Sequence, residues 1–409
     1  MASPTPSSTW SDADIERLLA PIARSLAQPT ALSPLPYDLN AGVPDAASLP
    51  AEALAQAARR ALELDPAGAL TYGGNMGYAP LRAWIAERYT RDTGVAVTPA
   101  HITLTSGSAH AIDNIAATFI GPGDVVAMGA PTYPGAIRSF KARGAKIVDV
   151  PQDRDGLRMD ALADTLERQR AAGEPAKLIY VICNYDNPTS ATLPVERRRE
   201  LARLAEQYKV LVVEDDAYTG IDLDGPPPTS LFEIADGKGI LRVGTFSKTI
   251  ATGLRVGWVA AEPAIIRALA FMRFDNGGAP FVHHTIHQYL LSGAYDPHVE
   301  HLRAIYRERR DVAMEAVRQE CGELVSCPTP AGGFFLWLEL RGGLLALDVF
   351  EAAKRLGVAV TPGIGYYPNG GGQQFIRLVF SALPPEQLRA AIALFGQACH
   401  EVAAGRAGT

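Results

Sequence analysis

Two short runs decide the fold class: Leu178-Ile-Tyr-Val-Ile-Cys183 and Val210-Leu-Val-Val-Glu-Asp215. Both are almost continuously apolar, a pattern typical of strands that are covered on both faces. Residues 195–208 lie between them and have the mixed-charge pattern of a solvated helix. A buried strand, a helix and a second buried strand predict a right-handed crossover between parallel strands.

The same alternation extends in both directions from this unit. Strands are expected at residues 101–105, 125–128, 146–150 and 240–245. Helices are expected at residues 15–26, 51–63, 79–91, 108–119, 134–143, 158–172, 263–272 and 282–292. We therefore predict an α/β protein whose large domain, residues 46–292, is built on a mostly parallel sheet.

The C-terminal quarter has a different pattern. Strands near residues 332–340 and 375–380 alternate with helices at 297–320, 347–356 and 384–404. This predicts a smaller α+β domain over residues 293–409. Residues 1–45 form an N-terminal arm, which we expect to pack with the smaller domain.

Composition excludes several functional classes. The chain has 409 residues, of which 47% are hydrophobic and 20% charged, a balance typical of globular proteins. The 38 Lys and Arg against 44 Asp and Glu give a net charge of −6, which provides no basic surface for nucleic acid or an anionic membrane. No apolar run reaches the length of about 18 residues that a spanning helix needs.

The N-terminus and the cysteines predict a cytoplasmic location. The first residues show no basic region followed by an apolar one, so we expect no signal peptide. None of the four cysteines forms a CxxC pair or has zinc-ligand spacing, and so few thiols favour a reducing compartment. They are Cys183, Cys321, Cys327 and Cys399.

Polar residues gather where the predicted strands end. In open parallel sheets, ligands bind beyond the carboxyl ends of the strands. Those ends supply a Gly-containing turn into a helix, an aromatic ring, amide and phenol groups, a carboxylate, a lysine and an arginine. They are found at residues 106–110, 132–134, 184–190, 215–218 and 247–258. Together they suit a flat, phosphorylated, electron-withdrawing heteroaromatic ligand.

One of these segments carries a family resemblance. Thr245-Phe-Ser-Lys248-Thr-Ile-Ala-Thr-Gly-Leu-Arg255-Val-Gly-Trp258 resembles the lysine motif of class I/II aminotransferases that depend on pyridoxal 5'-phosphate (PLP). Asn187-Pro-Thr and Asp215-x-x-Tyr218 match the other two signatures in the same order. The resemblance extends over residues 37–394, and the nearest subgroup is the aminoadipate/valine type. It implies PLP-transferase fold type I, with a seven-stranded sheet sandwiched by helices.

The resemblance also implies catalytic roles. Lys248 would hold PLP as a Schiff base and then move a proton, for which its amine must be neutral and partly desolvated. Asp215 would pair with the pyridine nitrogen and keep the ring protonated. Asn187 and Tyr218 would hydrogen-bond the phenolic oxygen of the ring, and Tyr133 would stack on its face.

The remaining roles concern the phosphate, the substrate and a second subunit. Arg377 would grip the substrate α-carboxylate, with Gly42 and Asn187 beside it. Tyr72 would reach the phosphate in a partner subunit, which implies a homodimer. The phosphate would be bound by Ser106, Gly107, Ser108, Ala109 and Arg255, with Thr245 or Ser247 completing the cup.

Several positions depart from the family pattern. They are Ser190, the pair Ala109-His110, Thr252, Asp186 and the histidine-rich segment 276–287. One interpretation is drift with helix packing; the other is that His110, Asp186 or His284 lines a modified substrate pocket. His283 and His287 have metal-capable helical spacing but no acidic or cysteine partner nearby in sequence, so no metal is expected.

Three functions follow in order of preference. The first is transfer of an amino group from an L-amino acid to a 2-oxo acid. The second keeps PLP but eliminates a substituent, loses CO2 or reacts with O2 in specialised metabolism. The third is a PLP-sensing regulator, which ranks last because only about thirty-five residues precede the aminotransferase-like part and they contain no helix-turn-helix.

Overall fold

The computed structural model describes residues 10–25 and 35–407, and its centre is one large sheet with strand order β2-β9-β8-β7-β6-β3-β4-β5. Strands β3, β4, β6, β7 and β8 are parallel, whereas β9 is antiparallel to both of its neighbours. The bounds are β2 Ile102–Thr105, β3 Val125–Ala130, β4 Lys146–Asp153, β5 Gly156–Leu157, β6 Ala176–Val181, β7 Leu211–Asp215, β8 Ile240–Thr245 and β9 Gly257–Ala260. The predicted α/β sheet is confirmed, and the two-residue β5 extends its edge.

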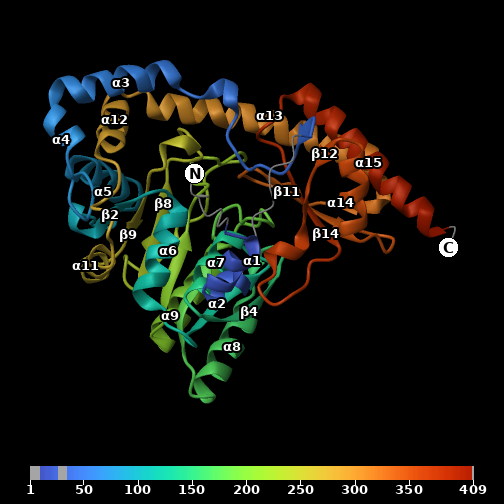
Figure 1. Ribbon diagram of the computed structural model, residues 1–409, viewed down its shortest axis with the longest axis horizontal. Helices are drawn as coiled ribbons and strands as arrows, with labels where there is room; N and C mark the ends of the chain where they lie inside the picture. Colours follow the sequence, from blue (N-terminus) through green and yellow to red (C-terminus); the bar gives the residue numbers. More distant parts are fainter. Residues whose placement is uncertain (1–9, 26–34, 408–409) are drawn as a thin grey trace, which may run out of the picture.

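Helices cover both faces of this sheet (Figure 1). On one face, α6, α7 and α11 enclose apolar side chains of β3, β6, β7, β8 and β9. On the other face, α5, α8, α9, α10 and α12 pack against β2, β3, β6 and β7. The bounds are α3 Ala51–Leu64, α4 Pro66–Leu70, α5 Ala79–Thr93, α6 Ser108–Phe119, α7 Pro134–Ala142, α8 Met159–Ala171, α9 Val195–Tyr208, α10 Leu231–Ile234, α11 Pro263–Phe271 and α12 Pro280–Leu291.

A second core forms beside a four-stranded sheet with order β10-β11-β14-β13. Its elements are β10 Val325–Ser326, β11 Phe335–Leu340, β13 Thr361–Pro362, β14 Phe375–Val379, α13 Tyr295–Cys321, α14 Ala346–Arg355 and α15 Pro385–Ala407. Leu39 is buried in the same core, and β1 (Tyr37–Asp38) pairs with β12 (Val358–Ala359). The segment around Leu39 therefore packs on this second core.

Two expectations need correction. The helix predicted over residues 15–26 is divided into α1 (Asp12–Leu18) and α2 (Pro21–Ser25), because Pro21 has no N–H for a continuous helix and sits well at a helix start. Residue 26 lies outside the described residues. Strand β9 was not expected as an element, since it begins inside the lysine motif at Gly257 and has no separate signal. No helix of the described residues is long and apolar enough to cross a membrane.

Candidate active site

A cavity of about 270 Å³ lies at the carboxyl ends of β6, β7 and β8. The large sheet, the second core and the N-terminal arm all contribute to its wall. Eleven of the predicted residues line it: Gly42, Ser108, Ala109, Tyr133, Asn187, Asp215, Tyr218, Ser247, Lys248, Arg255 and Arg377. The fold thus assembles groups that are up to 335 positions apart in the sequence (377 − 42).

Lys248 is a half-buried lysine in this cavity. Its Nζ donates a hydrogen bond of 2.7 Å to the carbonyl of Gly42. Burial lowers the pKa of Lys248 to about 8, with further contributions from the nearby cations Arg377 and Arg255. The amine is therefore far closer to its neutral, nucleophilic form at physiological pH than a solvated lysine is.

Asp215 ends β7 and is buried beside the lysine. One carboxylate oxygen, Oδ2, accepts a hydrogen bond of 2.6 Å from the Tyr180 hydroxyl. The other, Oδ1, is buried and has no hydrogen-bond partner in the described part of the chain. Burial raises the pKa of Asp215 to about 6, and the hydroxyl of Tyr180 opposes that rise. An unpartnered buried carboxylate oxygen fits the protonated nitrogen of a pyridine ring.

The first turn of α6 provides an anion seat. Ser108 and Ala109 line the cavity at this helix start, where backbone N–H groups lack helical partners and favour a phosphate. Gly107 precedes them with φ +81, and a Cβ there would lie 2.7 Å from Nη2 of Arg255. Arg255 in turn donates to the carbonyl of Ser106 at 3.1 Å. Only glycine lets this guanidinium approach the loop so closely.

Arg377 lies on β14 of the second sheet and lines the cavity. Its Nη1 donates to Oδ1 of Asn187 at 3.0 Å, and its Nη2 donates to the carbonyl of Asn40 at 2.6 Å. The guanidinium stacks on the ring of Phe335 at 4.3 Å. Its Nε is buried without a hydrogen-bond partner among the described residues. A held guanidinium with a spare donor suits a carboxylate.

Four predicted residues do not line the cavity. Gly107 and Ser106 are not among the lining residues and belong to the loop that leads into α6. The Thr245 hydroxyl is hydrogen-bonded to the carbonyl of Val256 at 3.0 Å and to Oγ of Ser247 at 2.9 Å and does not line the cavity, whereas Ser247, of the two alternatives, does. Tyr72 is 87% exposed on the molecular surface.

Three of the residues that depart from the family pattern have local partners outside the cavity, whereas Ala109 and Thr252 line it. Nδ1 of His110 accepts the backbone N–H of Ser106 at 3.1 Å, in the loop that leads into α6. Asp186 accepts the hydroxyl of Thr189 at 2.7 Å, and burial raises its pKa to about 7. His284 stacks on Tyr78 at 3.6 Å. None of the three histidine and aspartate candidates lines this cavity. Among the described residues, no group of three or more metal-ligating side chains occurs.

Sequence reasoning missed Tyr180 and Phe335. Tyr180 is the penultimate residue of β6, within an apolar run where an aromatic residue is interpreted as core, and Phe335 comes from the second sheet. A signal for Tyr180 did exist, because a hydroxyl in a fully buried strand needs a hydrogen-bond partner. Phe335 had no signal, since its position depends on the packing of the two cores.

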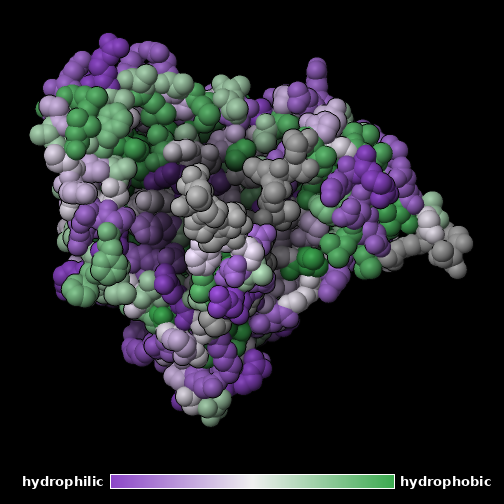
Figure 2. Space-filling model, in the orientation of Figure 1, coloured by the Kyte–Doolittle hydropathy of each residue, from purple (hydrophilic) through white to green (hydrophobic). Residues whose placement is uncertain are grey.

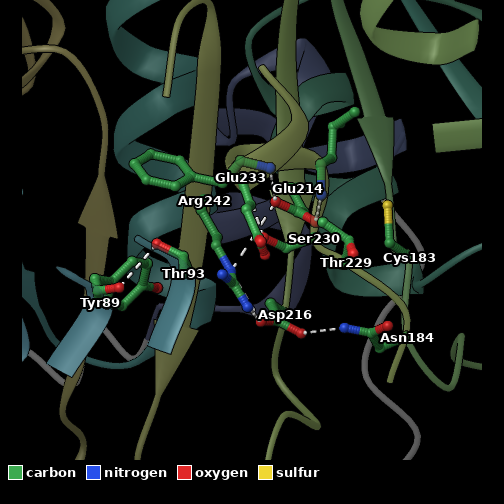
Figure 3. Close-up of polar contacts among 12 residues, drawn as sticks. Tyr89, Thr93, Cys183, Asn184, Glu214, Asp216, Thr229, Ser230, Glu233 and Arg242 are labelled. Carbon is green, nitrogen blue, oxygen red and sulfur yellow. Dashed lines mark hydrogen bonds and ion pairs between the residues drawn. The ribbon is translucent and has the colours of Figure 1, made fainter. Parts of the chain in front are cut away.

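The other side of β7 carries a buried ionic network, shown in Figure 3. Asp216 accepts from Nε of Arg242 at 3.0 Å and from Nδ2 of Asn184 at 3.0 Å. Glu214 accepts the backbone N–H groups of Leu231 and Phe232 at the start of α10. Asp215 therefore lies between two acidic residues whose charges are satisfied on the opposite face.

A lysine, a buried carboxylate, a helix start suited to an anion and an arginine with a spare donor meet in one cavity, and this set fits PLP. The chain belongs to the family of class I and II aminotransferases, whose model matches residues 36–395. It is 32% identical over 356 residues to aromatic-amino-acid aminotransferase 1 of Thermococcus litoralis, covering 87% of this chain and 85% of the relative.

Solved structures agree with the family assignment. The multiple substrate aminotransferase of Thermococcus profundus superposes with a TM-score of 0.90 at 29% identity, over 96% of this chain and all of that one. The α-aminoadipate aminotransferase LysN of Thermus thermophilus, complexed with N-(5'-phosphopyridoxyl)-L-leucine, gives 0.84 at 31% identity, over 95% of this chain and 97% of that one. The protein is a PLP-dependent transferase, and the unpartnered Oδ1 of Asp215 and the anion seat that follows Gly107 fit that cofactor.

Proposed function

We propose that this aminotransferase moves the amino group of an L-amino acid to a 2-oxo acid, with Lys248, Asp215 and Arg377 as its central residues. The observation that carries the proposal is that one cavity holds all three together with the anion seat of α6. When bound, PLP supplies an electrophilic carbonyl and a ring that accepts electrons from the substrate α-carbon.

Each residue has a distinct task in the proposal. Lys248 binds the cofactor covalently and afterwards, as a neutral amine, carries the proton of the α-carbon. Asp215 holds the ring nitrogen through Oδ1, while Tyr218 and Asn187 hydrogen-bond the ring oxygen. Arg377 orients the amino acid by its carboxylate, so that the bond to the α-hydrogen faces Lys248.

Phosphate binding falls to a second group of residues. We assign it to Ser108, Ala109, Ser247 and Arg255, and the stacking contact with the ring to Tyr133. Ser106, Gly107 and Thr245 support these groups from behind the cavity.

The two halves of the reaction can be tested separately. An amino acid panel without any 2-oxo acid should convert the bound cofactor to pyridoxamine phosphate once per site. Adding a 2-oxo acid should then restore the original absorbance and allow repeated turnover. Turnover without an acceptor, with release of ammonia, CO2 or peroxide, would instead support elimination, decarboxylation or oxidation and contradict the proposal.

Two residues that depart from the family pattern make structural contacts outside the cavity. The Ser190 hydroxyl donates to the carbonyl of Phe335 at 2.7 Å and links the two cores. His110 supports the phosphate loop from behind. Neither is placed to act on a substrate, so transamination is the function we retain.

We further propose a homodimer whose interface includes Tyr72. Leu64, Leu70, Tyr72, Phe271 and Phe274 are exposed large apolar residues, here called the apolar patch. The Tyr72 loop and the Phe274 segment are neighbours, because a Cβ at Gly277 would lie 1.9 Å from the carbonyl of Gly74. Figure 2 shows hydrophobic residues gathered over the region of α3 and α4. An exposed patch of this kind favours an interface.

Mixing two inactive variants tests this arrangement. Lys248→Ala removes the lysine of its own site, and Tyr72→Ala removes a group from the site of the partner. A mixed dimer would contain one site with both groups intact, so activity should reappear on subunit exchange. Absence of recovery in a mixture shown to exchange subunits would contradict a shared site.

We propose a biosynthetic or other amino-acid role in the cytoplasm, supported by four cysteines that are all free thiols. We also propose an arm of residues 1–45, a large domain of 46–292 and a small domain of 293–409. The burial of Leu39 among residues of the second core supports this division.

A further inference from the structure

Tyr180 and Asp215 form a fully buried pair beneath the cavity. Tyr180 lies on β6, one residue before the strand ends at Val181, and its side chain has no exposed surface. Its hydroxyl donates to Oδ2 of Asp215 at 2.6 Å, a short distance typical of a hydrogen bond to an ionised acceptor. Phe140 on α7 packs edge-on against the ring at 6.1 Å and limits its reorientation.

The proton of this pair belongs to the tyrosine. Burial and the adjacent carboxylate raise the pKa of Tyr180 well above its usual value, so the hydroxyl keeps its proton. Burial acts in the opposite sense on Asp215 by favouring its neutral form, and the hydroxyl counteracts this effect. Asp216, on the other face, adds repulsion that also disfavours the ionised form of Asp215.

The hydrogen bond also decides which oxygen is available. A carboxylate in this position has two equivalent oxygens until one of them is bound. Tyr180 occupies Oδ2, and Oδ1 remains buried without a partner in the described residues. Because Asp215 lines the cavity, its spare oxygen is available to a ligand there.

We propose that Tyr180 is a positioning residue, which keeps Asp215 ionised and presents Oδ1 to the ring nitrogen of the bound cofactor. This inference rests on the proposed role of Asp215. Tyr180 touches neither substrate nor cofactor in this arrangement and acts through the carboxylate alone. Loss of the Tyr180 hydroxyl should therefore weaken the contact between Asp215 and the ring nitrogen while leaving the phosphate seat of α6 intact.

The test measures the ring nitrogen directly. Holoenzyme is prepared with PLP labelled with ¹⁵N in the pyridine ring, and the ¹⁵N chemical shift is recorded at neutral pH for wild type and Tyr180→Phe. We expect a protonated nitrogen in the wild type and a shift toward the unprotonated value in the variant. The dissociation constant of PLP should rise about ten-fold, the effect of losing one hydrogen bond to a charged group.

Two further variants make the result specific. Tyr185→Phe is the matched control, because Tyr185 is also buried and donates to a carboxylate, Asp222, at 2.8 Å outside the cavity. It should leave the nitrogen shift unchanged. Tyr180→His keeps a donor at the position and should recover part of the wild-type shift, and it serves as a second probe if the Phe variant folds poorly.

A double substitution isolates the route through Asp215. In an Asp215→Asn background, Tyr180→Phe should cause little further loss of PLP affinity, because the carboxylate on which Tyr180 acts is gone. Equal losses in both backgrounds, or an unchanged nitrogen shift in Tyr180→Phe, would overturn the inference. A wild-type protein that binds PLP with an unprotonated ring nitrogen would instead overturn the proposed role of Asp215.

Discussion

The amine of Lys248 and the carbonyl of Gly42 are joined by a hydrogen bond of 2.7 Å, although 206 positions separate them. The bond ties the N-terminal arm to the loop that follows β8, across the cavity. Lys248 cannot keep this contact unchanged once its amine carries the cofactor. The arm thus has one attachment that changes on cofactor binding, whereas its ion pair between Asp45 and Arg309 does not involve the cavity.

The lowered pKa of Lys248 predicts how apoenzyme captures PLP as a function of pH. Only the neutral amine attacks a carbonyl, and its fraction rises as pH increases through about 8. We expect the rate of capture, measured by borohydride trapping and peptide mapping, to rise about ten-fold per pH unit below that value and then level off. A midpoint near that of a solvated lysine, or an adduct that persists in Lys248→Ala, would contradict this assignment.

Replacing Arg377 by lysine should impair binding of the amino acid more than binding of PLP. An ammonium cannot reproduce the contacts to Asn187 and Asn40 and also bind a carboxylate with two donors. We expect KM for the amino acid to rise about ten- to a hundred-fold, the loss of one charge-assisted contact. Arg389→Lys, in an exposed pair with Glu315, is the control and should leave KM unchanged. Equal kinetics for both variants would place the carboxylate elsewhere.

A methyl group at position 107 should disturb the phosphate seat. The Cβ of Gly107→Ala would lie 2.7 Å from Arg255, and the backbone there has φ +81. We expect PLP affinity to fall by at least about ten-fold, because Arg255 must withdraw from the loop. Gly94→Ala is the matched control: it also has a positive φ, but no atom lies within 4 Å of its added Cβ. PLP titration of both apoproteins separates loss of the seat from backbone strain.

Breaking the Asp45–Arg309 pair should destabilise the whole protein. The two groups meet at 2.6 Å, and both side chains are less than a tenth exposed. Asp45→Ala leaves a buried guanidinium without its counter-ion, which costs about 3–5 kcal/mol of unfolding free energy. Glu315→Ala breaks an exposed pair and should cost no more than about 1 kcal/mol. Chemical denaturation of the two variants measures the difference, and equal losses would show that burial of the first pair adds nothing.

The sequence predicted most of the large sheet and the cavity because two signals were strong. Continuous apolar runs mark β6 and β7 as buried strands, and polar residues at strand ends of a parallel sheet must meet at one edge. The choice between Thr245 and Ser247 was not predictable, since it depends on how the chain turns after β8. The contact of Tyr180 with Asp215 was not predictable for a related reason. An aromatic residue within an apolar run is interpreted as a core residue until the partner of its hydroxyl is known.

The alternation of carboxylates around Asp215 has a consequence for how this strand can change. Glu214 and Asp216 face the ionic network with Arg242, whereas Asp215 faces the cavity, because successive side chains along a strand point to opposite faces. Deleting or inserting one residue in β7 would exchange the two environments. A carboxylate that now pairs with Arg242 would face the cavity, and Asp215 would face Arg242. Length changes in this strand can be accommodated only two residues at a time.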